Sequence, residues 1–279
     1  MKQSLAHIRT SLAGIYPESE INALIRLIFE TVCGWNATQF LLNKEVVLSD
    51  TQRKEIEVIV CRLRKHEPVQ YILGKADFYS LLFEVNENTL IPRPETEELV
   101  DWVISEYKNF AGKLLDIGTG SGCIAVSLAK HLPQMDVSAV DISEKALETA
   151  GRNAKKNDVK IHFQQCDILM ENQKIIGNFD VIVSNPPYVL ESEKAEIQSN
   201  VLQYEPHKAL FVPNENTLLF YKAIADFSVK KLNENGSLYL EINRMFGKET
   251  AEMLAGKGFS SIEIRKDLSG NDRMIKCRK

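Results

Sequence analysis

Residues 113–132, KLLDIGTGSGCIAVSLAKHL, decide the fold of this chain. A short apolar run, KLLDIG, ends in closely spaced glycines, and the SGCIAVSLAKHL that follows has the pattern of a helix. Glycines at such a junction let the backbone turn sharply and let a ligand approach where a Cβ atom would clash. We therefore predict a strand, a glycine loop and a helix here, with a ligand site at the loop.

Strand and helix patterns alternate through the rest of the chain. Short apolar runs separated by amphipathic stretches are typical of an α/β fold with a doubly wound, mostly parallel sheet. The last two runs flank a turn at Gly270–Asn271 and can form the antiparallel edge that such sheets sometimes carry. The seven predicted strands lie at 113–118, 137–141, 161–167, 179–184, 236–243, 259–267 and 273–279. The predicted helices between them cover 121–132, 142–157, 217–232 and 248–258.

The first 75 residues have a helical pattern instead. Two series of apolar residues recur at three- and four-residue steps, which places each series on one face of a helix. Ser49 and Gln52, before the second series, have the spacing of a capping box, and Pro68 ends that series. We therefore predict a helical bundle at 1–75. The two series are Ile21, Leu24, Ile25, Ile28, Phe29, Val32 and Ile56, Ile59, Val60, Leu63.

Residues 76–92 connect this bundle to the sheet. Bulky apolar residues alternate with polar ones around Asn86 and Asn88, as in a β-hairpin or a short extended linker. A helix then starts at PETEELVDWVI, with acidic residues in its first turn, where the helix dipole favours them. The predicted domains are thus the bundle at 1–75, a β-hairpin linker at 76–92 and the α/β domain at 93–279.

Composition excludes several classes of protein. The chain has 279 residues, 44% hydrophobic and 26% charged, which is typical of a globular protein. Its net charge is −4, so we expect no direct nucleic-acid binding. No apolar run approaches the ~18–20 residues of a membrane span, and MKQSLAHIRT lacks the apolar stretch of a secretory signal, so we expect a cytoplasmic protein. Without CxxC or HxxxH spacings, we expect no metal site and no disulfide framework.

The glycine loop favours one cofactor over another. Its spacing is G-x-G-x-G, whereas dinucleotide binders use G-x-G-x-x-G. Asp116 before the loop would repel a phosphate but suits the ammonium of an amino-acid moiety, which favours S-adenosylmethionine over NAD. Asp141, at the end of the next strand, can accept hydrogen bonds from both ribose hydroxyls. Asp167 and Ile168 follow the third strand and could line the adenine. The predicted cofactor site comprises Asp116, Gly118, Thr119, Gly120, Ser121, Gly122, Asp141, Asp167, Ile168 and Asn185.

The NPPY sequence at 185–188 follows the fourth strand and opens into the same crevice, because ligands of such sheets bind outside the carboxyl ends of the strands. Its two prolines fix the backbone and remove two N–H donors. If the Asn185 side-chain oxygen and the Pro186 carbonyl each accept one N–H of a planar –NH2 group, the nitrogen lone pair can point at a sulfonium methyl. Tyr188 can stack on the flat amide or base. This chemistry needs positioning rather than a strong base, so we predict Asn185, Pro186 and Tyr188 as catalytic residues.

Three other functions share parts of this pattern. A methyltransferase of exocyclic amino groups in DNA or RNA would use the same turn, but it needs a surface that tracks phosphates. An NAD-dependent oxidoreductase has a similar fold, but the loop spacing and the lack of a catalytic His or Tyr–Lys arrangement speak against it. A binding module that lost its activity is disfavoured by the intact NPPY sequence.

The sequence resembles the release factor glutamine N5-methyltransferases (HemK/PrmC type). The resemblance implies a class I S-adenosylmethionine-dependent methyltransferase fold, Rossmann-like, behind an N-terminal helical bundle. This bundle either recognises the protein substrate, for which the crevice alone is too small an interface, or only supports the sheet. It also implies N5-methylation of the glutamine in the Gly-Gly-Gln motif of class-I peptide chain release factors, with S-adenosylhomocysteine as product. The shared motifs are PVQYILG (68–74), FY…F.V…LIPRPETE (78–97), DIGTGSGCIAV (116–126), VDIS (140–143), SNPPY (184–188), YEPHKAL (204–210), YLEI (239–242) and KDLSGNDR (266–273).

Site residues follow from the same resemblance. It implies that Asn185, Pro186, Pro187 and Tyr188 hold the glutamine amide. Arg93 and Glu95 shape the mouth of the site, or else form a salt bridge where the helix begins. Two stretches depart from the family pattern. SLLF (80–83) lacks the glycine that usually follows FY, and EINRMFG (241–247) differs after its first residues. We expect both to lie away from the reacting atoms.

Overall fold

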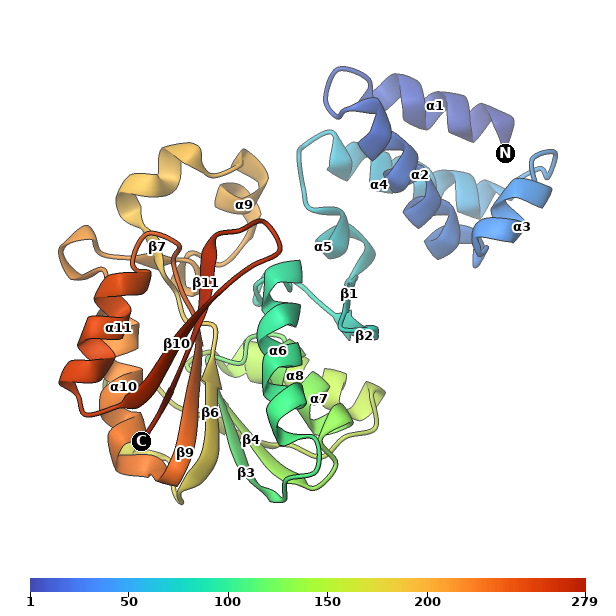
Figure 1. Cartoon of the computed structure of the whole chain (residues 1–279). Coiled ribbons are helices and arrows are strands. Elements are labelled where there is room, and N and C mark those ends of the chain that lie inside the picture. Colours follow the sequence, from blue (N-terminus) through green and yellow to red (C-terminus); the bar gives the residue numbers. More distant parts are fainter. The chain divides into compact units, whose positions relative to one another are not determined.

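The computed structural model describes residues 1–279, which divide into two compact units (Figure 1). Met1–Gly74 and Gln198–Tyr204 form the first unit, and Lys75–Ile197 and Glu205–Lys279 form the second. The linker hairpin therefore belongs to the second unit. The segment Gln198–Tyr204 lies with the helices although it follows the fourth strand by many residues, and the Tyr204 hydroxyl donates a hydrogen bond to the Lys65 carbonyl (3.0 Å).

The helical unit has its own core. The first predicted series lies on one helix and is buried except for Val32, which is half-buried. The capping box at Ser49 and Gln52 is present, with the two reciprocal hydrogen bonds at 2.9 and 3.2 Å. The second series is buried too, although its helix ends at Leu63, before Pro68. The helices of this unit are α1 (Lys2–Leu12), α2 (Glu18–Cys33), α3 (Ala37–Leu42), α4 (Asp50–Leu63), α5 (Val69–Leu73) and α9 (Ser199–Tyr204).

The β-hairpin is present, but its turn is not where the sequence predicted it. β1 (Lys75–Phe78) and β2 (Leu81–Glu84) are antiparallel and turn at Tyr79 and Ser80, not around Asn86 and Asn88. Tyr79 and Ser80 have φ of 47° and 60°, as a two-residue type I′ turn requires. Asn86 instead forms a local turn after the hairpin, where its side-chain oxygen accepts from the Asn88 N–H (2.9 Å).

Ser80 occupies a left-handed conformation that glycine adopts without steric cost. Ser80→Gly should therefore raise the free energy of unfolding by about 0.5–1 kcal/mol, as measured by urea denaturation. Ser105→Gly is the matched control, because Ser105 lies inside α6 (Pro94–Tyr107), where glycine should destabilise by about 1 kcal/mol. A stability loss for Ser80→Gly would contradict the expected strain.

The second unit contains the predicted seven-stranded, mostly parallel sheet, in the order β10-β11-β9-β6-β3-β4-β5. β5, β4, β3, β6 and β9 are parallel, and β11 and β10 form the antiparallel edge. Figure 1 shows helices on both faces of this sheet. The strands are β3 (Gly112–Ile117), β4 (Met135–Asp141), β5 (His162–Gln165), β6 (Phe179–Ser184), β9 (Leu232–Glu241), β10 (Ser260–Lys266) and β11 (Asp272–Arg278). The further helices are α7 (Cys123–His131), α8 (Glu144–Lys156), α10 (Leu219–Lys231) and α11 (Gly247–Gly256).

Alternate residues of the central strands pack into two separate hydrophobic cores, one on each face of the sheet. On β3, Leu114 packs with the core under α6 and α7, whereas Leu115 packs with the core under α10. This two-residue period on a strand buried on both faces is what a doubly wound sheet requires. No helix of the chain combines the length and the apolar character that crossing a membrane needs.

Short elements between β6 and α10 escaped the sequence prediction. β7 (Val189–Leu190) pairs in parallel with β8 (Phe211–Val212), and short 3-10 helices of three to six residues lie around them. Two-residue strands and helices of one or two turns are too short to produce a recognisable hydrophobic period.

Candidate active site

The glycine loop lies between β3 and α7, and its three glycines have different surroundings. Gly118, Gly120 and Gly122 all have positive φ, at 74°, 56° and 81°. A Cβ atom on Gly122 would lie 3.0 Å from the Ala150 Cβ, so this glycine lets α7 pack on α8. A Cβ on Gly118 or Gly120 would meet no atom within 4 Å. The loop therefore leaves an open cradle at its first two glycines, as a bound cofactor requires.

Asp116, near the end of β3, forms a hydrogen bond to the glycine loop. The side chain is fully buried, and its Oδ2 accepts a hydrogen bond from the Thr119 hydroxyl at 2.6 Å. Its Oδ1 has no hydrogen-bond partner. Burial raises the pKa of Asp116 to about 7. A buried carboxylate oxygen without a donor beside an open cradle fits the ammonium of S-adenosylmethionine, so this contact remains our prediction.

Asp141 ends β4 next to the loop. Its Oδ2 accepts from the Gly120 N–H (2.8 Å), and its Oδ1 accepts from the Ser143 N–H (2.9 Å). Burial raises the pKa of Asp141 above its usual value. Each carboxylate oxygen keeps a further lone pair, so both can accept from vicinal hydroxyls, as predicted for a ribose.

The other predicted cofactor residues are buried to different degrees. Asp167 is half-buried, with its Oδ1 accepting from the Leu169 N–H (2.9 Å), and Ile168 is mostly packed in a core. Thr119 and Ser121 are buried, so their contact with a cofactor remains a prediction. No cluster of three or more His, Cys, Asp or Glu side chains could hold a metal ion.

The NPPY turn lies beside the glycine loop, because β6 pairs with β3 and Ser184 donates a hydrogen bond to the Ile117 carbonyl (2.6 Å). The Asn185 Nδ2 donates to the Thr96 hydroxyl oxygen at 3.2 Å. The Asn185 side-chain oxygen and the Pro186 carbonyl accept no hydrogen bond within the chain, and Pro187 is half-buried. Both oxygens thus keep unused acceptor capacity, although Pro186 is buried, and their contact with a substrate –NH2 group remains a prediction.

The end of β9 contacts the NPPY turn, so the expectation that EINRMFG lies away from the site is wrong. The Tyr188 hydroxyl donates to Glu241 Oε1 (2.9 Å), and the Asn243 Nδ2 donates to the Tyr188 carbonyl (3.1 Å). β9 pairs in parallel with β6, so their carboxyl ends meet at the same edge. Tyr188 is thus held by its hydroxyl, and stacking of its ring on a substrate remains a prediction.

Comparison with known proteins decides the family. The chain matches the family models "PrmC N-terminal domain" over residues 3–74 and "Methyltransferase small domain" over residues 97–208. It is 48% identical to the release factor glutamine methyltransferase of Flavobacterium psychrophilum, covering 95% of this chain and 94% of that protein. The same enzyme of Bacteroides thetaiotaomicron is 44% identical, covering 99% of both chains. The chain belongs to the release factor glutamine methyltransferase family. It is therefore a methyltransferase that depends on S-adenosylmethionine, and the oxidoreductase alternative is wrong.

Solved structures agree with this fold. The hMettl16 catalytic domain in complex with MAT2A 3'UTR hairpin 6 matches with a TM-score of 0.56 at 18% identity, covering 85% of this chain and 84% of that one. A T. thermophilus 16S rRNA methyltransferase (RsmC) in complex with AdoMet and guanosine matches with a TM-score of 0.52 at 16% identity, covering 74% and 49%. At these identities the likeness concerns the methyltransferase fold alone.

Arg93 forms an ion pair with a residue far away in the sequence. Its guanidinium donates to Glu205 Oε1 at 2.6 Å, and the Ile91 N–H donates to Glu205 Oε2 at 3.2 Å. The Glu205 side chain is 1% exposed. Arg93 is the N-cap of α6, so the alternative of a salt bridge at the start of the helix is confirmed for Arg93, and this salt bridge joins the IPRPETE loop to YEPHKAL. Glu95 is half-buried, and its charge helps to raise the pKa of Glu241.

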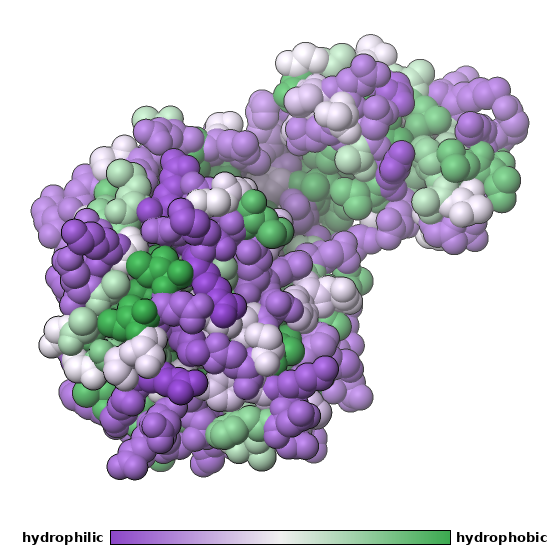
Figure 2. Space-filling view, in the orientation of Figure 1, coloured by the Kyte–Doolittle hydropathy of each residue, from purple (hydrophilic) through white to green (hydrophobic).

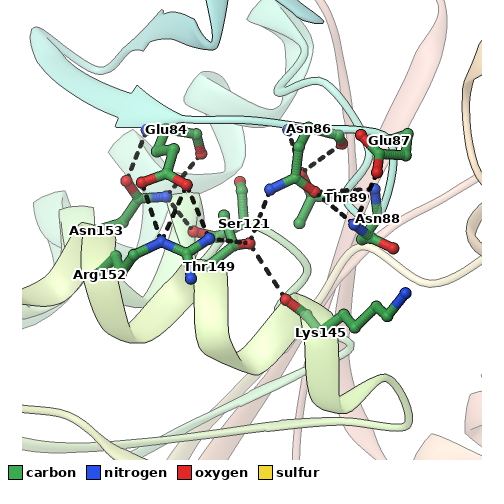
Figure 3. Close-up of polar contacts among 10 residues, drawn as sticks. All are labelled: Glu84, Asn86, Glu87, Asn88, Thr89, Ser121, Lys145, Thr149, Arg152 and Asn153. Carbon is green, nitrogen blue, oxygen red and sulfur yellow. Dashed lines mark hydrogen bonds and ion pairs between the residues drawn. The ribbon is translucent and has the colours of Figure 1, made fainter.

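A polar cluster on α8 links the hairpin to the glycine loop, and sequence analysis missed it (Figure 3). Asn153 is fully buried, its Oδ1 accepts from the Glu84 N–H (2.6 Å), and its Nδ2 donates to the carbonyls of Glu84 and Ser121 (both 2.9 Å). Arg152 forms an ion pair with the Glu84 carboxylate (2.7 Å). One helix side chain thus positions both the linker and the cofactor loop in this family member.

Removing the Asn153 side chain should therefore affect stability and cofactor binding together. Asn153→Ala leaves the Glu84 and Ser121 main-chain groups without partners, so we expect a loss of about 2–3 kcal/mol in the free energy of unfolding. Calorimetry should also show weaker S-adenosylmethionine binding. Lys156→Ala, at the exposed end of the same helix, should change neither quantity. Unchanged donor affinity in a folded Asn153→Ala protein would refute the link to the loop.

Proposed function

We propose that this chain transfers the methyl group of S-adenosylmethionine to the side-chain N5 of the glutamine in the Gly-Gly-Gln motif of class-I release factors. Its relatives are named release factor glutamine methyltransferases. The observation that carries the proposal is the pair of free acceptors at the NPPY turn, the Asn185 side-chain oxygen and the Pro186 carbonyl. They match the two N–H groups of a primary amide.

The turn makes a poor nucleophile reactive. An amide nitrogen shares its lone pair with the adjacent carbonyl, which weakens it as a nucleophile. When Asn185 and Pro186 each accept one N–H, they hold the nitrogen so that its lone pair faces the glycine-loop side of the crevice. When bound, S-adenosylmethionine supplies an electrophilic methyl carbon there and leaves as neutral S-adenosylhomocysteine. The new N–C bond forms from the nitrogen lone pair while the C–S pair returns to sulfur.

The chain contributes no general base at this point. Glu241 is the carboxylate beside the turn, but it is 1% exposed and accepts from the Thr96 and Tyr188 hydroxyls. The nitrogen becomes acidic as it is alkylated and can lose its proton to water afterwards. Asn185 and Pro186 therefore act by position and by their dipoles.

A DNA or RNA substrate is less well supported. The same two acceptors could hold the exocyclic amine of a base, but the chain carries a net charge of −4. We propose that it makes no direct contact with nucleic acid. Binding to RNA or DNA that weakens steeply with added salt would argue against this proposal.

Labelling decides between these substrates. The protein is incubated with methyl-labelled S-adenosylmethionine and a release factor that carries either Gln or Ala in its Gly-Gly-Gln loop. Label should enter the Gln protein alone, and mass spectrometry should place one methyl group on that side chain. Equal labelling of both proteins, or labelling of RNA in their place, would overturn the proposed function.

We propose further that the helical unit takes part in binding the release factor. Its surface exposes Leu42 and Val47 at 78% and 83%, and Figure 2 shows apolar side chains reaching the surface of this unit. Deleting residues 1–74 would also remove the partners of Gln198–Tyr204, so substitutions are the cleaner test. Leu42→Ser with Val47→Ser should raise KM for the intact release factor and leave KM for a short Gly-Gly-Gln peptide unchanged. An unchanged KM for the intact protein would contradict this role.

A further inference from the structure

Two buried polar residues lie behind the NPPY turn. Thr96 is in the first turn of α6, and Glu241 is the last residue of β9. Their exposed fractions are 2% and 1%. The Thr96 hydroxyl oxygen lies 2.6 Å from Glu241 Oε2 and 3.2 Å from Asn185 Nδ2. Glu241, Thr96 and Asn185 thus form a chain of hydrogen bonds that ends at the turn.

The number of hydrogens that Thr96 and Glu241 can donate determines the direction of this chain of hydrogen bonds. An ionised carboxylate can only accept, so Glu241 requires the Thr96 hydroxyl to donate. Threonine has one hydroxyl hydrogen, and once that is donated its oxygen can only accept from Asn185. The amide of Asn185 must then present its NH2 group to Thr96, which turns its oxygen to the opposite side.

We propose that Thr96 and Glu241 are positioning residues that set the direction of the Asn185 amide, so that its oxygen faces the substrate nitrogen. The inference rests on the proposed function, in which that oxygen accepts a substrate N–H. The opposite amide orientation would face the substrate N–H with a second donor and would lose the bond to Thr96. A hydroxyl at residue 96 and an ionised carboxylate at residue 241 are therefore both needed.

Glu241 also fixes the other side of the turn. Its Oε1 accepts from the Tyr188 hydroxyl at 2.9 Å, so its two oxygens receive one donor each. Burial raises the pKa of Glu241 above its usual value. The titratable and charged groups that face Glu241 are Glu95, Cys123, Tyr188, Tyr221 and Arg273.

The first test removes the hydroxyl while keeping the shape of the side chain. Thr96→Val should lower kcat about 10- to 10²-fold, with KM for the release factor and the Kd for S-adenosylmethionine within about twofold of wild type. Thr96→Ser, which keeps the hydroxyl, should restore most of kcat. Thr250→Val is the matched control, because Thr250 is equally buried and its hydroxyl has no partner. Full kcat in Thr96→Val would overturn the inference.

A double-mutant cycle separates positioning from mere support of the fold. If Thr96 acts through the Asn185 amide, Thr96→Val should cost nothing further in an Asn185→Ala background. Losses that multiply in the double variant would instead assign Thr96 a role independent of Asn185 and would overturn the inference.

The carboxylate is tested by pH and by NMR. A protonated Glu241 can donate as well as accept, so it no longer fixes the direction of the hydrogen bonds through Thr96 to Asn185. The kcat of the wild type should therefore fall as the pH drops through a pKa above the usual ~4.3 of a glutamate. Glu241→Gln can donate to Thr96 and reverse the chain, so it should lower kcat at least about 10-fold and abolish this acid limb. In the wild type, the Asn185 side-chain NH2 protons should exchange slowly, and in Thr96→Val they should exchange fast. Fast exchange of the Asn185 NH2 protons in the wild type would contradict the hydrogen bond from Asn185 to Thr96.

Different results would refute this inference and the proposed function. A wild-type protein that does not label the release-factor glutamine refutes the proposed function. Wild-type labelling combined with an unaffected Thr96→Val refutes only the inference.

Discussion

Asn185→Ala should lower kcat for release-factor methylation at least about 10²-fold at saturating S-adenosylmethionine. The substitution removes one of the two free acceptors at the turn and leaves the Pro186 carbonyl in place. With one N–H unheld, the amide stays planar and its lone pair stays delocalised into the carbonyl. A loss of this size corresponds to about 2.7 kcal/mol in the activation free energy.

The measurement is single-turnover transfer of labelled methyl with saturating release factor. Asn178→Ala is a suitable control, because Asn178 is exposed and lies just before β6, at the end of the strand opposite the NPPY turn. Near wild-type turnover of Asn185→Ala would refute the role of the turn and, with it, the mechanism proposed above.

Asp141→Ala should weaken S-adenosylmethionine binding about 10²-fold. The substitution removes the expected acceptor of the ribose hydroxyls and also releases the N–H groups of Gly120 and Ser143, which Asp141 holds at 2.8 and 2.9 Å. Hydrogen bonds to a charged group contribute about 1.5–3 kcal/mol each, so two lost ribose bonds account for a change of this size.

Calorimetric titration with S-adenosylmethionine measures this Kd directly. Asp136→Ala is the control, because Asp136 is an exposed aspartate near the opposite end of β4. It should leave the Kd within about twofold. An unchanged Kd for Asp141→Ala would mean that the donor does not lie against the end of β4.

Sequence alone predicted the sheet because its signals are local. Apolar runs of strand length, glycines at the first turn and a capping serine such as Ser49 each act over a few residues, and the Ser49 side chain does cap α4. The family resemblance rested on motifs of the same kind. Parallel pairing brings the ends of β3, β4 and β6 to one edge, so the strand pattern was enough to assign Asp141 and Asn185 to one crevice.

What sequence could not predict depends on contacts between distant residues. The hairpin turns at Tyr79 and Ser80, which both have positive φ, and the sequence has no glycine there to mark the turn. Thr96 and Glu241 are 145 residues apart, and only the packing of α6 against the end of β9 brings them together. A single sequence carries no signal of such a pair.

The passage of the chain through Gln198–Tyr204 has a consequence for building hybrids of this enzyme. The backbone leaves the α/β unit before this helix and returns after it, so the helical unit is assembled from two separate stretches of chain. An exchange of residues 1–74 with a relative would pair a foreign bundle with a native α9. A working chimaera should therefore need both stretches transplanted from the same parent, and a graft of the first stretch alone should express poorly.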